Sequence, residues 1–385
     1  MRGAAAAPIP AAAVRPLRRL SAPYRIMIVD DSTVVRGLLK RSIEADPELS
    51  VVASVGDGQM ALNAVRRHDV EVAILDIEMP VMDGLTALPK LIAAKPGIRV
   101  LIASTVTRRG ADVSLRALAA GAADYVTKPG SAAMITADEF KRELIGKLKV
   151  LAHAHRSAQG EAQPTAAQVS DAHPPAAPVR RGGDIRLRPQ GSEPPEILAI
   201  GSSTGGPQAL FRLLKDLALL QQPILITQHM PATFTTILAE HIQRIAGRPA
   251  AEAVDGAVIE PGQIYLAPGD FHMVVESDGT RRRIRINKEP PENFCRPAVD
   301  PMLRSIARAY GKRALCAILT GMGQDGLRGG EAVVAAGGTM IAQDEKTSIV
   351  WGMPGAVATA GLCSAVLPLE EIGATIMRLA GRRAP

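Results

Sequence analysis

The chain contains few cysteines, and it lacks any long apolar run. Its 385 residues include three cysteines, which are too few and too widely spaced for a disulfide framework. They form no Cys-x-x-Cys pair, so the sequence predicts no structural zinc site, and free thiols are typical of a reducing, cytoplasmic setting. Because no run of about 18 apolar residues occurs, we expect no membrane insertion. A hydrophobic fraction of 47% still provides for buried cores, which excludes disorder over the whole chain.

Basic residues exceed acidic ones by seven, from 45 lysines and arginines against 38 aspartates and glutamates. Four of the excess charges lie in residues 1–22, an acid-free segment of mainly alanine, proline and arginine that we predict to be a disordered extension. A second basic cluster begins at Arg281, and in it Arg283 and Arg285 alternate with Ile284 and Ile286. This alternation predicts a hairpin strand with a solvated face, and no aromatic side chains are interleaved to stack on bases. We therefore expect no nucleic-acid partner.

Residues 151–194 separate two blocks of different composition. This segment is rich in proline and alanine and poor in large aliphatic side chains, so we predict a flexible linker whose histidines, including His153 and His155, are solvated. The flanking blocks, 23–150 and 195–385, alternate short apolar runs with longer helical patterns. The alternation predicts the α/β class, with two doubly wound parallel-sheet domains whose ligands bind beyond the carboxyl ends of the strands.

Polar residues follow the apolar runs of the first block. They are Asp30, Asp31, Asp76, Ser104, Thr105 and Lys128, and Pro129 follows Lys128. Because parallel strands end at the same edge of a sheet, we expect these side chains to converge there. Three carboxylates together make a hard oxygen site suited to Mg²⁺. A carboxylate beside such an ion can accept a phosphoryl group and form an acyl phosphate.

The motifs that contain these residues resemble the receiver domain of two-component response regulators. They are IMIVDDS (26–32), LDIEMPVMDG (75–84) and DYVTKP (124–129). The resemblance implies a flavodoxin-like domain over residues 23–150, with Asp76 as the phosphorylation site. It implies three metal ligands, Asp30, Asp31 and Asp76. It also implies phosphate-sensing roles for Ser104 and Lys128 and a switch role for the aromatic Tyr125.

The second block opens with a strand, a glycine-rich loop and a helix over residues 196–217. A serine in this loop lies near the helix N-terminus, where backbone N–H groups favour developing negative charge. One interpretation is a phosphate-binding loop, but neither Gly-x-x-x-x-Gly-Lys-Ser/Thr nor Gly-x-Gly-x-x-Gly is present. The other is a nucleophile turn, which requires a histidine and an acid elsewhere in the block.

The second block contains three histidines. His229 ends an apolar run and is therefore expected at the carboxyl edge of the sheet, whereas His241 lies within a polar helical stretch and His272 follows a loop. Asp325 lies in the glycine loop that follows the apolar run 314–319. A nucleophilic serine, a histidine and an aspartate can thus meet above the sheet in the chain order Ser, His, Asp.

Six motifs of this block resemble the catalytic domain of chemotaxis protein-glutamate methylesterases, the CheB family. They are GSSTGGP (201–207), TQHMP (227–231), YLAPGDFHM (265–273), CRPAVDPML (295–303), LTGMGQDG (319–326) and WGMPGAV (351–357). The resemblance implies a Rossmann-like, three-layer esterase domain over residues 195–385. It implies Ser203 as the nucleophile, His229 as the base and acid, and Asp325 as the residue that orients His229. It also implies Thr204 as a neighbour of the histidine and Met322 as an oxyanion donor through its backbone N–H.

Some roles stay open at this point. The motif places the nucleophile directly before Thr-Gly-Gly, which selects Ser203 over the adjacent Ser202. Met322 has plain loop packing as its alternative role. Trp351 and Arg296 stay open between contact with the substrate and packing.

The resemblance implies hydrolysis of glutamyl γ-methyl esters on chemoreceptors, with release of methanol, and deamidation of receptor glutamines to glutamate. The implied partners are methyl-accepting chemotaxis receptors as the substrate and a chemotaxis histidine kinase as the phosphodonor. Mg²⁺ is implied for receiver phosphorylation and no cofactor for the esterase reaction. The unphosphorylated receiver is expected to block Ser203, and phosphorylation of Asp76 to relieve the block.

Two other functions have requirements that the sequence can be compared with. A DNA-binding response regulator would need a small helix-turn-helix output, which the α/β pattern of residues 195–385 does not predict. A relative that serves as a phosphate sink, or that hydrolyses esters on another protein, stays open because filled triad positions do not identify a substrate.

Overall fold

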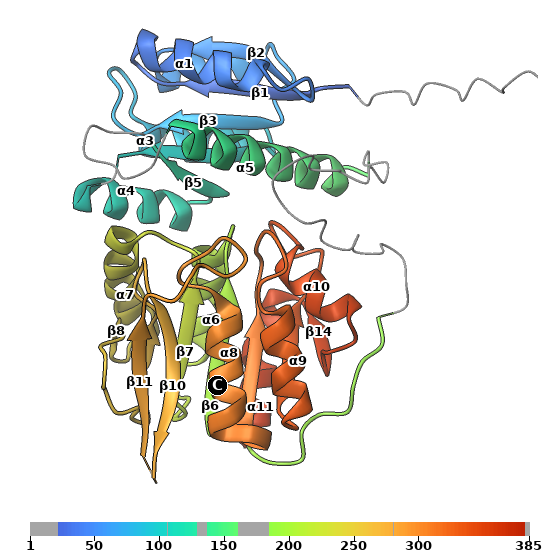
Figure 1. The fold of residues 1–385 in the computed structure, drawn as a ribbon. Coiled ribbons are helices and arrows are strands. Elements are labelled where there is room, and N and C mark those ends of the chain that lie inside the picture. Colours follow the sequence, from blue (N-terminus) through green and yellow to red (C-terminus); the bar gives the residue numbers. More distant parts are fainter. Residues whose placement is uncertain (1–21, 106, 129–136, 161–184, 280, 382–385) are drawn as a thin grey trace, which may run out of the picture.

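The computed structural model describes residues 22–105, 107–128, 137–160, 185–279 and 281–381. Figure 1 shows two layered α/β domains, with the N-terminal domain stacked over one end of the C-terminal domain. The predicted basic extension, apart from residue 22, and residues 161–184 of the predicted linker lie outside the described residues. Within the described ranges, no helix has the length and apolarity needed to cross a membrane.

The N-terminal domain is built on a five-stranded parallel sheet in the order β2-β1-β3-β4-β5. Its strands are β1 (Tyr24–Val29), β2 (Leu49–Val55), β3 (Val72–Asp76), β4 (Arg99–Ser104) and β5 (Asp124–Thr127). The central strands β1, β3 and β4 are apolar and buried over most of their length, as expected of parallel strands covered on both faces.

Five helices cover this sheet. They are α1 (Thr33–Glu44), α2 (Gly58–Val65), α3 (Gly84–Ala94), α4 (Arg108–Ala119) and α5 (Ala137–Ala158). The first four begin behind Ser32, Asp57, Asp83 and Thr107, whose side chains each accept a backbone N–H of the first turn. Helices α1 and α5 pack on one face and α2, α3 and α4 on the other. Helix α4 and strand β5 thereby lie at the side that faces the second domain (Figure 1).

The C-terminal domain is built on a seven-stranded parallel sheet in the order β14-β13-β12-β6-β7-β9-β8. Its strands are β6 (Ile197–Ser202), β7 (Ile224–Gln228), β8 (Ala250–Glu252), β9 (Ile264–Leu266), β12 (Ala314–Ile318), β13 (Thr339–Gln343) and β14 (Ala365–Leu367). Strand β6 lies between β7 and β12, so the strand order reverses there and creates a switch point at the carboxyl ends. Two parallel-sheet domains confirm the predicted fold class.

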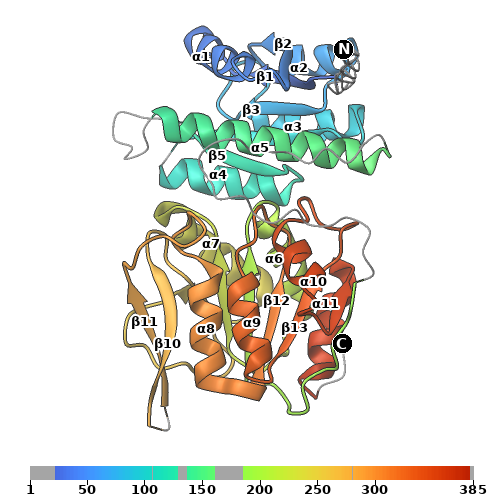
Figure 2. The same cartoon turned by 45° about the vertical axis from the view of Figure 1, so that its right-hand side comes forward.

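Helices cover both faces of the second sheet, as Figure 2 shows from another side. Helices α6 (Gly206–Asp216), α7 (Ala232–Ala246) and α11 (Leu369–Leu379) pack on one face. Helices α8 (Val299–Tyr310), α9 (Leu327–Ala335) and α10 (Met353–Thr359) pack on the other, and a short 3-10 helix (Gly311–Arg313) precedes β12. Strands β10 (His272–Asp278) and β11 (Arg281–Asn287) form the antiparallel hairpin that the arginine–isoleucine alternation predicts.

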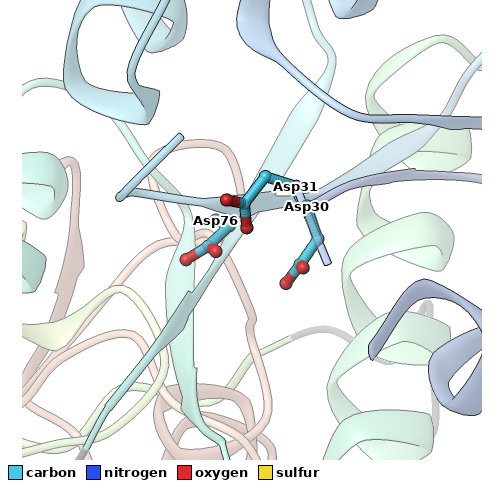
Figure 3. Close-up of side chains that lie close together, drawn as sticks. All are labelled: Asp30, Asp31 and Asp76. Atoms are coloured by element: carbon cyan, nitrogen blue, oxygen red, sulfur yellow. The ribbon is translucent and has the colours of Figure 1, made fainter. Parts of the chain in front are cut away.

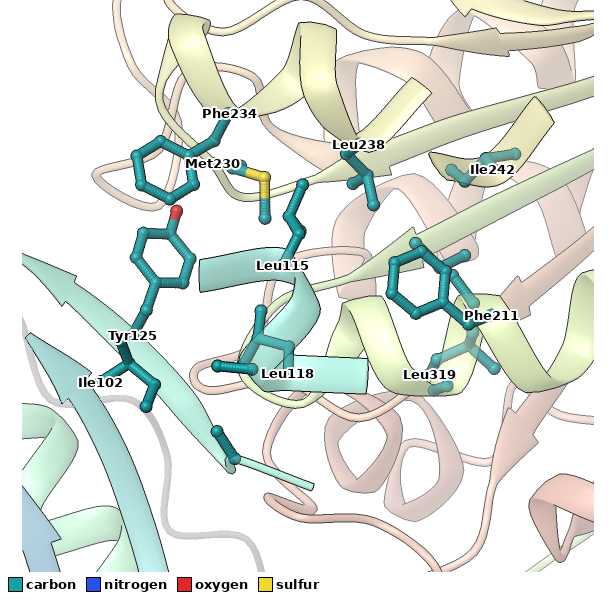
Figure 4. Close-up of a cluster of buried hydrophobic side chains, with 14 of the residues drawn as sticks. Ile102, Leu115, Leu118, Tyr125, Phe211, Met230, Phe234, Leu238, Ile242 and Leu319 are labelled. Carbon is teal, nitrogen blue, oxygen red and sulfur yellow. The ribbon is translucent and has the colours of Figure 1, made fainter. Parts of the chain in front are cut away.

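The two domains share a hydrophobic cluster at their junction. Leu115 and Leu118 of α4 and Tyr125 of β5 meet side chains of α6 and α7 in this cluster (Figure 4). The rings of Tyr125 and Phe234 stack with centroids 4.4 Å apart. Burial of apolar surface in a contact of this kind stabilises the docked arrangement of the two domains.

Polar contacts surround the shared cluster. Thr204 Oγ1 donates to Asp124 Oδ2 over 2.7 Å, and His241 Nε2 lies 3.0 Å from Asp112 Oδ1. Since Thr204 directly follows Ser203, the receiver strand β5 contacts the loop that carries the predicted nucleophile.

The predicted linker begins too early in the sequence. Helix α5 continues through Ala158, because its apolar face extends over Leu148, Leu151 and Ala152, which are fully buried. His155 is also buried rather than solvated, and its Nδ1 lies 2.8 Å from the carbonyl oxygen of Gly97. The segment therefore belongs to the receiver domain up to the end of this helix.

The stacked ring at the junction leads to a prediction for Phe234→Ala. Truncation of a buried phenylalanine costs about 3–5 kcal/mol, and here part of that loss falls on the contact between the domains. We expect the amides of α4 to exchange faster with solvent deuterium in the full-chain variant. Phe140→Ala, which opens the receiver's own core, is the matched control. Unchanged protection of α4 in Phe234→Ala would contradict the shared cluster.

Candidate functional site

Ser203 lies at the carboxyl end of the central strand β6. Its backbone N–H donates to the carbonyl of Thr320, in the loop after β12, over 3.0 Å. Helix α6 begins behind Gly205, whose φ of 77° lies in the left-handed region that glycine adopts without steric cost, and Pro207 occupies the first turn. The serine therefore lies at the switch point and beside the positive end of a helix dipole.

The two adjacent serines have different surroundings. Ser202 is fully buried, and its hydroxyl donates to Gln228 Oε1 over 2.7 Å. Ser203 is half-buried, and Gln228 Nε2 donates to its carbonyl over 2.9 Å. Among the described residues, no hydrogen bond engages the Ser203 hydroxyl. Ser202 is thus part of the packed core, whereas the Ser203 hydroxyl stays available to another partner.

The loop after β12 packs directly against Ser203. A Cβ at Gly321 would lie 2.9 Å from Ser203 Cβ and 2.4 Å from Met353 Sδ, so only glycine fits there. The next residue, Met322, is 41% exposed, and its Cε lies 3.7 Å from the place of a Cβ on Gly146 of α5. No hydrogen bond within the described ranges engages the Met322 N–H. The Met322 N–H therefore lies one residue after Gly321, which packs on Ser203.

His229 and Asp325 form a buried pair. His229 directly follows β7, and its Nε2 lies 2.7 Å from Asp325 Oδ2, with side chains 11% and 1% exposed. Asp325 also accepts the backbone N–H groups of Val299 and Asp300, at the start of α8, over 2.6 and 3.0 Å. Burial opposes its ionisation, but His229 and these N–H groups hold the pKa of Asp325 below its ordinary value. The carboxylate is therefore an ionised acceptor that orients the imidazole.

Asp300 and Asn293 complete this arrangement, and no sequence pattern predicts a role for either residue. Asp300 Oδ1 accepts the N–H groups of Gly326 and Gly329, at the start of α9, over 3.0 and 2.7 Å. Asn293 Nδ2 donates to Asp300 Oδ2 and to Asp325 Oδ1 over 3.0 and 2.9 Å. Burial, and then the charge of Asp325, raises the pKa of Asp300 to about 6. The Asp325 carboxylate thus caps the N-terminus of α8, and the adjacent Asp300 carboxylate caps the N-terminus of α9.

Cys295 lies on the other side of the His229 ring. Its Sγ is 3.4 Å from His229 Nδ1, so the imidazole is held between a thiol and Asp325. No hydrogen bond between described residues joins Ser203 Oγ to His229. Burial lowers the pKa of His229, but Cys295 and Asp325 outweigh burial and raise it to about 10. Cys295 begins the motif CRPAVDPML (295–303), but the motif does not predict this contact, because a loop brings Cys295 back to a histidine 66 positions away.

Three other residues of the sequence motifs lie beside the site. The Thr204 hydroxyl donates to Asp124 of the receiver rather than to His229. Trp351 Nε1 donates to a backbone carbonyl over 3.0 Å while its ring packs on the second core. Arg296 pairs with Asp270 at 2.7 Å. The structure therefore gives Trp351 and Arg296 packing contacts.

The receiver carboxylates form a separate cluster, which Figure 3 shows. One oxygen from each of Asp30, Asp31 and Asp76 lies within 4.8 Å of the others. Lys128 Nζ lies 2.7 Å from Asp30 Oδ2 and 2.8 Å from Asp76 Oδ2. Burial raises the pKa of Asp76, although Lys128 acts in the opposite direction. This set of hard oxygen donors fits the predicted Mg²⁺.

The two other predicted receiver residues lie toward α4 and the second domain. Ser104 Oγ donates to the carbonyl of Gly110 in the first turn of α4 over 3.0 Å. Tyr125 is 5% exposed at the junction, and burial raises its pKa well above the ordinary value. The predicted switch aromatic is therefore enclosed between the two domains.

The buried pair leads to a prediction for Asp325→Asn. Replacement of a carboxylate that stabilises the imidazolium by a neutral amide should lower the pKa of His229. An NMR titration of the histidine nitrogens in the full chain measures this shift. Asp112→Asn removes the acid beside His241 and should leave the His229 titration unchanged. A His229 pKa that does not fall in Asp325→Asn would rule out the electrostatic coupling.

Comparisons with known proteins give the same two domains. The family model for the response regulator receiver domain matches residues 26–138, and that for the CheB methylesterase matches residues 198–376. A protein-glutamate methylesterase/protein-glutamine glutaminase of Paramagnetospirillum magneticum is 59% identical over 93% of this chain and 97% of its own. An Azospirillum brasilense protein of the same name is 58% identical over 94% of each chain.

Solved structures also match each half of the chain. The catalytic domain of Thermotoga maritima CheB is 39% identical, covers 48% of this chain and 98% of its own, and has a TM-score of 0.47. The response regulator domain of the same protein is 34% identical over 33% of this chain and 94% of its own, with a TM-score of 0.30. The relatives that align over almost the whole length confirm the predicted family and enzyme class, and the chain belongs to the CheB methylesterase family, with an N-terminal receiver domain.

Proposed function

We propose that this chain hydrolyses glutamyl γ-methyl esters on chemoreceptors and deamidates receptor glutamines, with Ser203, His229 and Asp325 as its catalytic triad. The observation that carries the proposal is the buried pair of His229 and Asp325, whose side chains lie 2.7 Å apart. His229 directly follows β7, the strand that pairs with β6, after which Ser203 lies. The names of the relatives support the substrate, since they are protein-glutamate methylesterases and protein-glutamine glutaminases. Their substrates transfer to this chain as part of the proposal.

Each of the three side chains has its own step in the proposed reaction. Asp325 holds the Nε2–H of His229, which leaves Nδ1 to take the proton of the Ser203 hydroxyl. Ser203 Oγ then attacks the ester carbonyl, and the oxygen of the tetrahedral intermediate accepts the Met322 N–H. Such a donor typically contributes about 3 kcal/mol. His229 returns the proton to the leaving methoxide, and methanol departs.

A water molecule completes the cycle. His229 takes a proton from the water as its oxygen attacks the acyl-enzyme, and Ser203 leaves with a proton from the imidazolium. The products are a glutamate carboxylate and the free serine. The same steps on a glutamine side chain release ammonia in place of methanol.

We further propose that the receiver restrains this reaction until Asp76 is phosphorylated. Its α4–β5 surface covers α6 and α7, and Asp124 holds the residue after Ser203. Mg²⁺ held by Asp30, Asp31 and Asp76 would neutralise the charge of the incoming phosphoryl group. A phosphoryl group on Asp76 attracts Lys128, which now bridges Asp30 and Asp76, and Ser104, which is bound to α4. Movement of α4 and Tyr125 then weakens the shared cluster.

The proposed partners follow from this cycle. A chemotaxis histidine kinase supplies the phosphoryl group to Asp76, and the cytoplasmic helices of methyl-accepting chemotaxis receptors present the esters. The protein therefore acts in the cytoplasm, and the esterase step uses only side chains and backbone N–H groups of the chain.

Methanol release from methylated chemoreceptor membranes tests the proposal. We expect wild type to release methanol and a small-molecule phosphodonor with Mg²⁺ to raise the rate. Ser203→Ala should reduce release by at least about a thousandfold, as expected for loss of a nucleophile. Asp76→Asn should keep the basal rate and lose the stimulation.

The control is Ser202→Ala, which removes the neighbouring hydroxyl and should retain the phosphodonor response. Full activity of Ser203→Ala would show that Ser203 is not the nucleophile. If neither wild type nor any variant released methanol, the ester substrate would have to be on a protein other than a chemoreceptor.

A further inference from the structure

The His229 imidazole has two nitrogens, and one of them is fully committed. Nε2 lies 2.7 Å from Asp325 Oδ2, and Asp325 is an ionised acceptor among several N–H donors. The proton on Nε2 therefore stays there in both the neutral and the charged ring. Only Nδ1 is left to take a proton from a nucleophile.

Nδ1 already has a partner. Cys295 Sγ lies 3.4 Å from it, within hydrogen-bond distance for sulfur, and a thiol carries one proton that either atom can hold. Nδ1 has a single lone pair in the plane of the ring, so it accepts one hydrogen at a time. While a proton is shared between Cys295 Sγ and His229 Nδ1, Nδ1 cannot accept the proton of the Ser203 hydroxyl. This holds whether Sγ or Nδ1 carries the shared proton.

The thiol is held in this place by its own loop. Glu292 and Cys295 exchange backbone hydrogen bonds of 3.1 and 2.9 Å, and Asn293 between them is tied to the Asp325 carboxylate over 2.9 Å. On the other side, Arg296 pairs with Asp270 at 2.7 Å. Residues on both sides of Cys295 are thus anchored, which limits the directions that its side chain can take.

We propose that Cys295 competes with Ser203 for Nδ1 of His229, so that the thiol restrains the catalytic base in the resting enzyme. The inference rests on the proposed triad and adds a residue that sets its resting state. Reaction requires Nδ1 to exchange the thiol for the serine hydroxyl. Cys295 acts through His229 and is therefore a positioning residue.

The test compares methanol release by the full-length wild type, Cys295→Ala and Ser203→Ala, on methylated chemoreceptor membranes with Mg²⁺ and a phosphodonor. We expect Cys295→Ala to raise kcat about fivefold, which corresponds to about 1 kcal/mol, with KM unchanged. Cys363→Ala, which removes a buried free thiol from the second core, is the matched control and should match wild type.

The pH dependence gives a readout that a purely structural role would not move. Asp325 and Cys295 are the titratable groups that raise the pKa of His229, and Asp300 reaches it only through Asn293 and Asp325. Cys295→Ala removes one of these two groups and should therefore lower the pKa of the His229 imidazole. The acid limb of the kcat profile should therefore move to lower pH in Cys295→Ala.

The outcomes separate this inference from the proposed function. If Cys295→Ala equals wild type in kcat and in pH profile while Ser203→Ala is inactive, the competition is refuted and the triad stands. If Cys295→Ala loses activity but unfolds at the same temperature as wild type, the thiol is required rather than restraining, which also refutes the inference. If Ser203→Ala keeps full activity, the proposed triad itself is wrong.

Discussion

The contact between strand β5 of the receiver and the serine loop of the second domain holds the two domains in register. Asp124 accepts the hydroxyl of Thr204, and the next residue, Tyr125, stacks on Phe234 of α7. A hydrogen bond and an aromatic stack from two consecutive residues thus connect the phosphorylation domain to the residue after Ser203. Because Asp124 is buried and also pairs with Lys147 at 3.3 Å, its position is set by the receiver's own packing.

The His229–Asp325 pair is held in place by a different set of contacts. Asp325 receives the first N–H groups of α8, and Asp300 receives those of α9, so two helix ends hold the two acids. Asn293 bridges the acids from a left-handed backbone conformation with φ of 51°. This arrangement fixes the Asp325–His229 contact, whereas Nδ1 on the other side of the ring has, among the described residues, only the 3.4 Å contact with Cys295 Sγ. Movement on activation is therefore expected at Nδ1 and at the domain junction rather than at Asp325.

Much of this could be predicted from the sequence, because parallel strands bring the residues after them to one edge. Ser203, His229 and the Asp30, Asp31 and Asp76 cluster each follow an apolar run, and the structure places each at a strand end. The extent of α5 was missed because the composition of residues 151–158 resembles the linker that follows. Its apolar positions contact the receiver sheet only once the helix is docked.

The other residues that contact His229 and Asp325 are brought to the site by the tertiary fold, which no local sequence pattern predicts. Cys295, Asn293 and Asp300 belong to a loop and a helix start that return to the site from the sequence between β11 and α8. Thr204 lies in a recognised motif, yet its partner is Asp124 in another domain, 80 positions earlier. Spacing within one domain cannot predict a contact of that kind.

We propose that the docked receiver limits access to Ser203. The rate of methanol release from methylated chemoreceptor membranes can be compared between residues 195–385 alone and the full chain without phosphodonor, at equal concentrations. We expect a higher rate for the isolated domain, because the α4–β5 surface no longer covers α6, α7 and the serine loop. Equal rates, or a slower isolated domain that is fully folded, would contradict it.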